Sequence, residues 1–180
     1  MQLRERKNRI GVYCLTGRDF SGKTTLLKKM QSKGKKIIGH SHDLLPKDHQ
    51  WISELVSQVC PHTFITHTNA QEKCIFFTTI ALAKINLAYT VAHRYKCTVL
   101  MDGYIYKWLA REWVRGTISD HAIQKLLPTL PKPDGLIIMN CKQPFTRPTA
   151  PSCLEYLASP DDFDHFQNQT LDKMMQMIQI

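Results

Sequence analysis

The sequence lacks paired cysteines, internal repeats and any obvious domain linker. Its six cysteines are scattered over 180 residues with no Cys-x-x-Cys spacing, which argues against a zinc site and against a disulfide framework. The basic residues at the N-terminus are followed by no long apolar segment, so we expect no secretion signal. These features predict a cytoplasmic protein with reduced thiols and a single domain over residues 1–180.

Acidic residues are also few relative to basic ones. The chain has 24 Lys and Arg against 15 Asp and Glu, for a formal net charge of +9. Such a charge first suggests a nucleic-acid partner, but no segment interleaves basic and aromatic residues, and we expect none. A basic cleft that attracts small polyanions such as nucleotide substrates accounts for the charge instead.

Residues 17–25 have the pattern of a phosphate-binding loop, Gly-x-x-x-x-Gly-Lys-Thr. An apolar run, Ile10–Leu15, precedes the loop and a helical pattern follows it, which is the context that this motif requires. Glycines let backbone N–H groups point inward at phosphate oxygens, and the helix N-terminus adds partial positive charge. The residues predicted to bind a nucleotide are Gly17, Arg18, Asp19, Phe20, Ser21, Gly22, Lys23, Thr24 and Thr25.

Several side chains in and near this loop suit phosphoryl transfer. Lys23 is expected to contact the β- and γ-phosphates of ATP, and the Thr24 hydroxyl to hold Mg²⁺. Asp102 ends a third apolar run and is predicted to join the Mg²⁺ site or to orient the acceptor; the alternative is a cap for the next helix. Arg18 and Arg147 are candidates to neutralise the transferred phosphoryl group, although Arg147 has the alternative of a solvated loop residue.

Apolar runs and helical patterns alternate along the chain. The runs expected to form strands are 10–15, 36–40, 97–102 and 136–140, and the expected helices are 24–32, 46–59, 70–96, 104–114, 120–127 and much of 153–180 with a break near 159–160. This alternation predicts an α/β fold, a three-layer αβα sandwich with a mostly parallel sheet and its ligand at the C-terminal strand ends. A Pro/Thr-rich stretch at about 141–152 is expected to be a lid-like loop.

The longest helical candidate, residues 70–96, contains an apolar stretch with a single charge, Lys84. A membrane span is one interpretation, and a helix buried in a domain or a dimer interface is the other. A lysine at the centre of a membrane span is costly, and neighbouring polar residues such as Thr78 and Asn86 add to the cost. We therefore expect no membrane association.

Taken in order, these motifs resemble the thymidylate kinase-like branch of the P-loop nucleoside monophosphate kinases, from Ile10 to about Lys173. The resemblance rests on the loop Gly-x-Asp-x-x-Gly-Lys-Thr-Thr, on the long helix leading into Val-Leu-Met-Asp-Gly-Tyr at 99–104, and on Leu-Pro-Lys-Pro-Asp at 130–134. A lid-like loop and a helix with Phe163 and Phe166 follow. The resemblance implies a P-loop NTPase fold of the nucleotide kinase type and a homodimer. It also implies transfer of a phosphoryl group from ATP with Mg²⁺ to a nucleoside monophosphate, dTMP-like in acceptor, as in nucleotide biosynthesis.

The resemblance also assigns acceptor contacts. Asp19 matches a carboxylate that contacts the acceptor sugar hydroxyl in the family. Tyr104, Lys84 and Lys107 are further candidates for acceptor contacts.

The chain departs from the family where the acceptor phosphate binds. Gly103 stands in place of an arginine that holds this phosphate, and no arginine lies near Ala81, where the family has another contact. Lys84 is the nearest cation, and Lys107 and Arg111 on the following helix are candidates to substitute. Two alternatives stay open, namely a kinase for a nucleoside or other small hydroxyl acceptor and a catalytically degenerate nucleotide-binding module.

Overall fold

The computed structural model of the chain describes residues 10–19, 21–39, 42–59, 68–139 and 160–179. The strands in these residues are β1 (Gly11–Gly17), β2 (Lys36–Ile38), β3 (Thr98–Asp102) and β4 (Gly135–Met139). They form one parallel sheet in the order β2-β3-β1-β4. The pairing sets Leu15 of β1 opposite Asp102 of β3, which brings the end of the predicted loop strand beside the predicted carboxylate.

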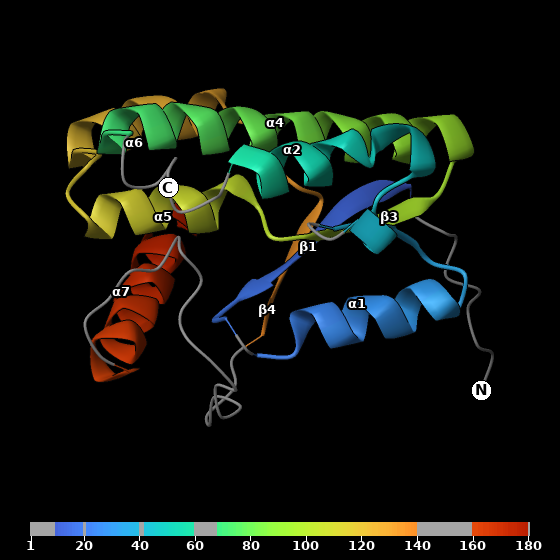
Figure 1. Cartoon of the computed structure of the whole chain (residues 1–180), viewed down its shortest axis with the longest axis horizontal. Helices are drawn as coiled ribbons and strands as arrows, with labels where there is room; N and C mark the ends of the chain where they lie inside the picture. The colour runs from blue at the N-terminus through green and yellow to red at the C-terminus, as the bar shows by residue number, and fades with distance from the viewer. Residues whose placement is uncertain (1–9, 20, 40–41, 60–67, 140–159, 180) are drawn as a thin grey trace.

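Helices cover both faces of this sheet. The α-helices are α1 (Lys23–Ser32), α2 (Trp51–Val59), α4 (Ala70–Tyr95), α5 (Ile105–Val114), α6 (Asp120–Leu126) and α7 (Pro160–Ile178), and the short 3₁₀ helices are η1 (His42–Leu44), η2 (Lys47–His49) and η3 (Leu127–Thr129). α4 packs on one face and α1 on the other, while α5 lies beside α4 and α7 packs against α5 (Figure 1). The predicted three-layer αβα architecture is therefore confirmed.

The core divides into two clusters, one on each side of the sheet. The larger cluster joins strand residues to α4 and α5, and its fully buried members include Val12, Cys14, Val99, Met101, Ile85, Ala88, Ile105 and Leu109. The smaller cluster lies under α1 and consists of Leu15, Leu27, Ile37 and Leu44. Full burial of one aliphatic side chain contributes about 1.5–3 kcal/mol, so the sheet is held mainly by these two layers.

α4 has defined ends and two unlike sides. A capping box begins it, with the Asn69 side chain accepting from the Glu72 N–H at 2.9 Å and the Glu72 carboxylate accepting from the Asn69 N–H at 2.9 Å. One side packs on the sheet, whereas Ile75 is 62% exposed. By length and composition Cys74–Tyr95 matches a membrane-spanning helix, with mean hydropathy 1.6 and 28% of its most apolar stretch buried. The expectation of a buried helix thus holds for one side only, and the absence of a membrane role stays a prediction.

Two expected elements differ from the structure. The helix predicted for 46–59 is split into η2 and α2, and Trp51, the first residue of α2, is 51% exposed. The second strand ends at Ile38 because the Gly39 N–H turns to the Leu44 carbonyl at 2.9 Å. The structure describes α7 from Pro160, a residue suited to the first helical position, and the break predicted near 159–160 stays a prediction because the residues before Pro160 lie outside the described part of the chain. The lid-like loop at 141–152 lies outside the described residues.

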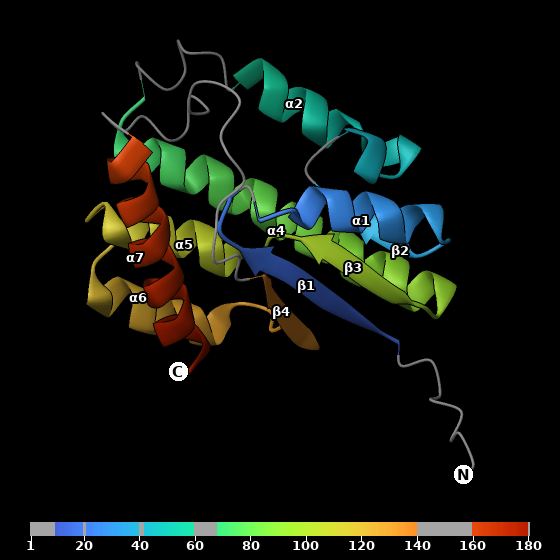
Figure 2. The same ribbon diagram turned by 90° about the horizontal axis from the view of Figure 1, so that it is seen from below.

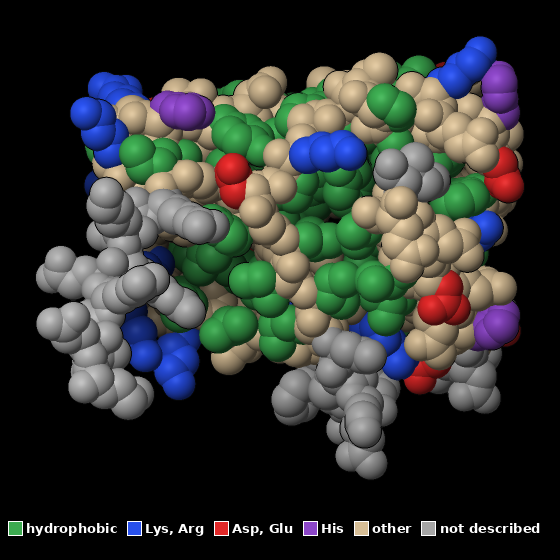
Figure 3. All heavy atoms as spheres, turned by 180° about the vertical axis from the view of Figure 1, so that it is seen from behind, with side chains coloured by type: hydrophobic (Ala, Val, Ile, Leu, Met, Phe, Trp, Pro, Cys, Tyr) green, Lys and Arg blue, Asp and Glu red, His purple; other side chains and the backbone are tan. Residues whose placement is uncertain are grey.

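The strand ends point toward α5 and α7. Figure 2 shows the arrowhead of β1 directed at the end of the molecule where these two helices lie. From behind, on the side where β4 forms the edge of the sheet, hydrophobic side chains gather across the middle of the surface (Figure 3). One exposed member of the β4 strand is Ile137. The ligand site predicted at the strand ends therefore lies between the sheet, α5 and α7.

Candidate active site

The loop that joins β1 to α1 depends on two glycines with positive φ. Gly17 has a φ of +134°, and a Cβ there would lie 2.2 Å from the Met139 carbonyl oxygen, so no other residue fits without displacing β4. Gly22 has a φ of 83° and turns the chain into α1, where its carbonyl accepts from the Leu26 N–H at 3.0 Å. The loop geometry thus explains both glycines of the motif.

Lys23 folds back over the loop. Its ammonium donates to the carbonyl oxygens of Gly17, at 3.3 Å, and of Arg18, and to the Ser21 hydroxyl at 3.3 Å. This position inside the loop is where an ammonium can exchange carbonyl partners for phosphate oxygens. Thr24 lies on the first turn of α1 and is exposed, so its hydroxyl is accessible from the site. Phe20 lies outside the described residues.

Asp19 is engaged by side chains from two helices. Its carboxylate accepts from the Lys107 ammonium at 2.6 Å, from the Arg111 guanidinium, and from the Gln167 side-chain amide at 3.0 Å. The Asp19 N–H donates to the Gln167 side-chain oxygen at 3.1 Å. The loop is thereby tied to α5 and to α7 through one residue.

Asp102 is buried at the end of β3. Burial raises the pKa of its carboxyl group, while the positive charges of Lys84, Lys23 and Lys107 oppose that rise. The alternative of a helix cap is not observed, because Tyr104 occupies the N-cap position of α5 and no side chain caps it. The predicted neighbourhood of loop and carboxylate is therefore present.

Lys84 and Tyr104, predicted to contact the acceptor, lie beneath the site. Lys84 is 2% exposed, and its ammonium donates to the Asp102 backbone carbonyl at 3.3 Å. Burial lowers the pKa of Lys84 to about 8, although Asp102 opposes this. Tyr104 is also buried, its hydroxyl donates to the Pro131 carbonyl, and burial raises its pKa. Their acceptor roles stay predictions, and these buried contacts argue for positioning roles instead.

The cations on α5 and in the loop each have an acidic partner. Burial and the neighbouring Arg111 lower the pKa of Lys107 to about 8, and Asp19 opposes this effect. Arg18 pairs with Asp164 of α7 at 2.8 Å. Sequence reasoning missed Asp164 and Gln167, whose spacing of three on a helix is too common to signal a site. Arg147, the other predicted arginine, lies outside the described residues.

The oxygens present suit Mg²⁺ better than a softer metal. Among the described residues, no group of three or more His, Cys, Asp and Glu side chains is placed to hold a metal ion. Mg²⁺ needs no such cage, because it binds through one or two protein oxygens, waters and substrate phosphates. The Thr24 hydroxyl and the Asp102 carboxylate are oxygens of this kind, so these residues fit the ion.

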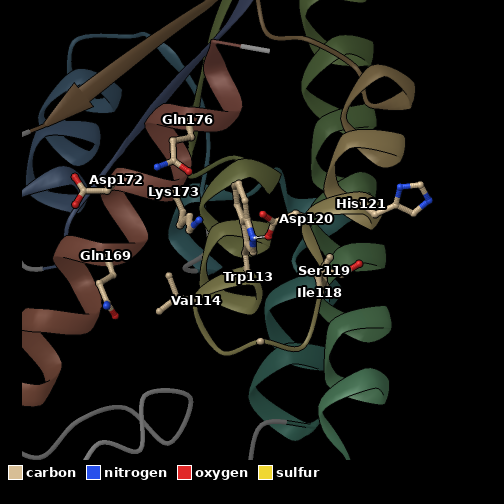
Figure 4. Close-up of a pocket in the computed structure, with 11 residues that line it drawn as sticks. Trp113, Val114, Ile118, Ser119, Asp120, His121, Gln169, Asp172, Lys173 and Gln176 are labelled. Atoms are coloured by element: carbon tan, nitrogen blue, oxygen red, sulfur yellow. Dashed lines mark hydrogen bonds between the residues drawn. The ribbon is translucent and has the colours of Figure 1, made fainter.

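A separate cavity of about 780 Å³ lies away from the loop, between the end of α5, the start of α6 and α7 (Figure 4). Its wall includes Trp113, whose indole N–H donates to Asp120 at 2.5 Å and whose ring lies 3.9 Å from the Lys173 ammonium. None of the loop residues, nor Asp102, lines it. This cavity is therefore distinct from the candidate active site.

Comparisons with known proteins support the fold. No protein-family model matches the chain, and no curated protein sequence matches it. The structure is similar to that of thymidylate kinase from Candida albicans, with a TM-score of 0.57 and 17% identity over 94% of this chain and 78% of that one. It is also similar to thymidylate kinase from Ehrlichia chaffeensis, with a TM-score of 0.59 and 16% identity over 94% of this chain and 81% of that one. The chain thus has a thymidylate kinase-like P-loop NTPase fold.

Proposed function

We propose that this protein transfers a phosphoryl group from ATP, with Mg²⁺, to a nucleoside monophosphate that is dTMP-like. The observation that carries the proposal is the Lys23 ammonium, held inside a two-glycine loop that follows β1, the strand paired with the end of β3 where Asp102 lies. A cation and a carboxylate at adjacent parallel strand ends are what a nucleotide phosphate tail and its metal require. The similarity to thymidylate kinases supports the same class of reaction.

The reaction needs positioning and charge neutralisation more than acid–base chemistry. An oxygen of the acceptor phosphate attacks the γ-phosphorus, the bond from that phosphorus to the β–γ bridging oxygen breaks, and ADP leaves with the bridging oxygen. The attacking oxygen is already ionised at neutral pH, so no protein base must remove a proton. Lys23 and the loop N–H groups neutralise charge on the transferred group. Mg²⁺, when bound through Thr24 and Asp102, would supply further neutralisation of the phosphates.

An uncharged acceptor is the second candidate, because Gly103 provides no side chain at the strand end where the family has an arginine. A nucleoside or another small hydroxyl compound would need no cation there. A nucleotide-binding module without turnover is a third outcome. A homodimer and a cytoplasmic location stay predictions, and exposed apolar residues of α4 such as Ile75 are what a dimer would cover.

The test is a coupled assay of ADP release over a panel of nucleoside monophosphates and their parent nucleosides, with ATP and Mg²⁺. We expect turnover with a monophosphate, and a loss of about 10²-fold or more in kcat for Lys23→Ala. ATP affinity of the same variant, measured by calorimetry, should fall about tenfold or more. Lys29→Ala, an exposed change on the same helix, is the control and should alter neither value. An unchanged ATP affinity in Lys23→Ala would overturn the assignment of the loop.

A further inference from the structure

We propose that Lys107 and Arg111 of α5 form the subsite for the acceptor phosphate, and that Asp19 occupies this subsite until a phosphate displaces it. The inference rests on the proposed function and names the acceptor as an anion. We call Lys107 and Arg111 together the α5 fork. It would replace, from the following helix, a cation that the strand end at Gly103 does not provide.

The geometry of the α5 fork is that of an anion site. Lys107 and Arg111 lie one helical turn apart, their side chains are only 13% and 12% exposed, and both donate to the Asp19 carboxylate. Like charges at this spacing repel each other, and little water screens them here. An anion between them reduces this repulsion and favours the charged form of Lys107, and Asp19 serves as that anion in this structure.

Several cations converge on the Asp19 carboxylate. Arg18 pairs with Asp164, and Asp19 lies within 4.0 Å of Lys23, Lys107 and Arg111. Among the described residues, the Arg18 Nε is also a buried donor without a hydrogen-bond partner. A phosphate monoester carries about −1.5 to −2 charge at pH 7 and three acceptor oxygens, so it matches the fork better than a carboxylate with one charge.

The α5 fork also lies at the right place in the site. Lys107 contacts Asp19 at 2.6 Å, the same loop residue that Lys23 approaches at 4.0 Å, and its charge opposes the rise that burial causes in the pKa of Asp102. A phosphate held by the fork is therefore placed beside the loop that would hold the ATP phosphates. Displacement would release the Asp19 carboxylate to contact the acceptor sugar hydroxyl, which is the role that the family resemblance implies. A nucleoside has no phosphate, so it could not displace Asp19 from the α5 fork.

A purely structural role, in which the fork only ties the loop to α5, makes different predictions. Binding of inorganic phosphate is measured by calorimetry with saturating ADP present, so that the loop is occupied. Arg111→Met should weaken phosphate binding about tenfold or more, because a charge-assisted, two-point contact is lost, and Arg111→Lys should lie between it and the wild type. Asp19→Asn should strengthen binding severalfold, since a neutral amide competes less for the fork.

Kinetics provide the second readout. For the best monophosphate of the assay panel, Arg111→Met should raise the acceptor KM about tenfold or more and leave the KM for ATP within about twofold. Arg115→Met is the matched control, since Arg115 lies one turn further on the same helix and pairs with Glu112 at 2.7 Å. It should change neither binding nor KM. Circular dichroism of each variant checks that α5 is intact.

The outcomes separate the two proposals. Phosphate affinity and acceptor KM that are unchanged in Arg111→Met, with Lys23-dependent turnover intact, would overturn the α5 fork and leave the proposed function standing. Phosphate binding that depends on Arg111, without turnover of any acceptor, would support the fork and overturn the kinase activity. Weaker phosphate binding in Asp19→Asn would contradict the displacement step.

Discussion

Replacing Lys84 with methionine should change how the stability of the fold depends on alkaline pH. Lys84 is 2% exposed, and burial lowers its pKa from 10.5 to about 8 in the folded protein, against the opposing charge of Asp102. In the unfolded chain the group returns to its ordinary value. Between these two pKa values the unfolded state holds more protons than the folded state, so the free energy of unfolding rises with pH across this range.

The expected size follows from the two pKa values. They differ by between two and three pKa units, and each unit corresponds to about 1.4 kcal/mol, which gives about 3 kcal/mol in total. Because Lys84 is almost completely buried, solvent screening reduces this figure little. The wild-type protein should therefore gain about 3 kcal/mol from this one group between about pH 7.5 and about pH 10.5, whereas Lys84→Met should gain nothing from it.

Urea unfolding followed by tryptophan fluorescence, repeated at several pH values in this range, measures the effect. The difference in unfolding free energy between wild type and Lys84→Met should increase steadily with pH by about 3 kcal/mol. Titrating groups other than Asp102 and Cys14, whose pKa values the Lys84 charge affects, are shared by the two proteins and cancel in this difference. Lys29→Met, which removes an exposed lysine, is the control and should show a constant difference. A difference for Lys84→Met that stays constant within about 0.5 kcal/mol would refute the reasoning.

Two further predictions concern the loop and the residue beneath it. Gly17→Ala should destabilise the fold by about 2–4 kcal/mol in urea unfolding and abolish ATP binding, because its Cβ would meet the Met139 carbonyl oxygen at 2.2 Å. Gly34→Ala is the control: Gly34 has a φ of +76° and nothing within 4 Å of a Cβ, so this change should cost only about 1–2 kcal/mol. Equal losses of stability in the two variants would contradict the steric argument. Tyr104→Phe should lose about 1 kcal/mol of stability, because the hydrogen bond to the Pro131 carbonyl is removed, with no change in acceptor KM. A raised KM without a loss of stability would instead show that the hydroxyl contacts the acceptor.

Much of the fold could be predicted because its signals are local. Continuous apolar runs predicted the strands, and the helix predicted over 120–127 begins where Ser119 accepts from the Ala122 N–H at 3.2 Å. At 46–59, where a single helix was predicted, neighbouring apolar residues differ in burial. Ile52 is buried in α2, whereas the adjacent Trp51, about 100° away around the helix, is exposed.

The site was predictable only where it is a local motif. The loop glycines and Lys23 share one short segment, and Asp102 ends a strand adjacent to it, so motif and topology sufficed for them. The partners of Asp19 are 88, 92 and 148 residues away in the chain, and their meeting depends on how α5 and α7 pack. For Lys84 the problem was different. The sequence shows a single charge in an apolar helix, but it does not show that the side chain is buried beneath the end of the sheet.

The charges at this end of the sheet are costly for folding, and that cost itself indicates function. Burial raises the pKa of Asp102 and lowers those of Lys84 and Lys107, so each ionised form is disfavoured and persists through attraction to its neighbours. Packed hydrophobic residues of similar volume would often stabilise such a place more. A polyanionic ligand that binds only the folded state would offset this cost, because it supplies negative charge to the α5 fork and Lys23. Under the proposed function, the same charges that make this end of the sheet costly for folding would favour a phosphate ligand.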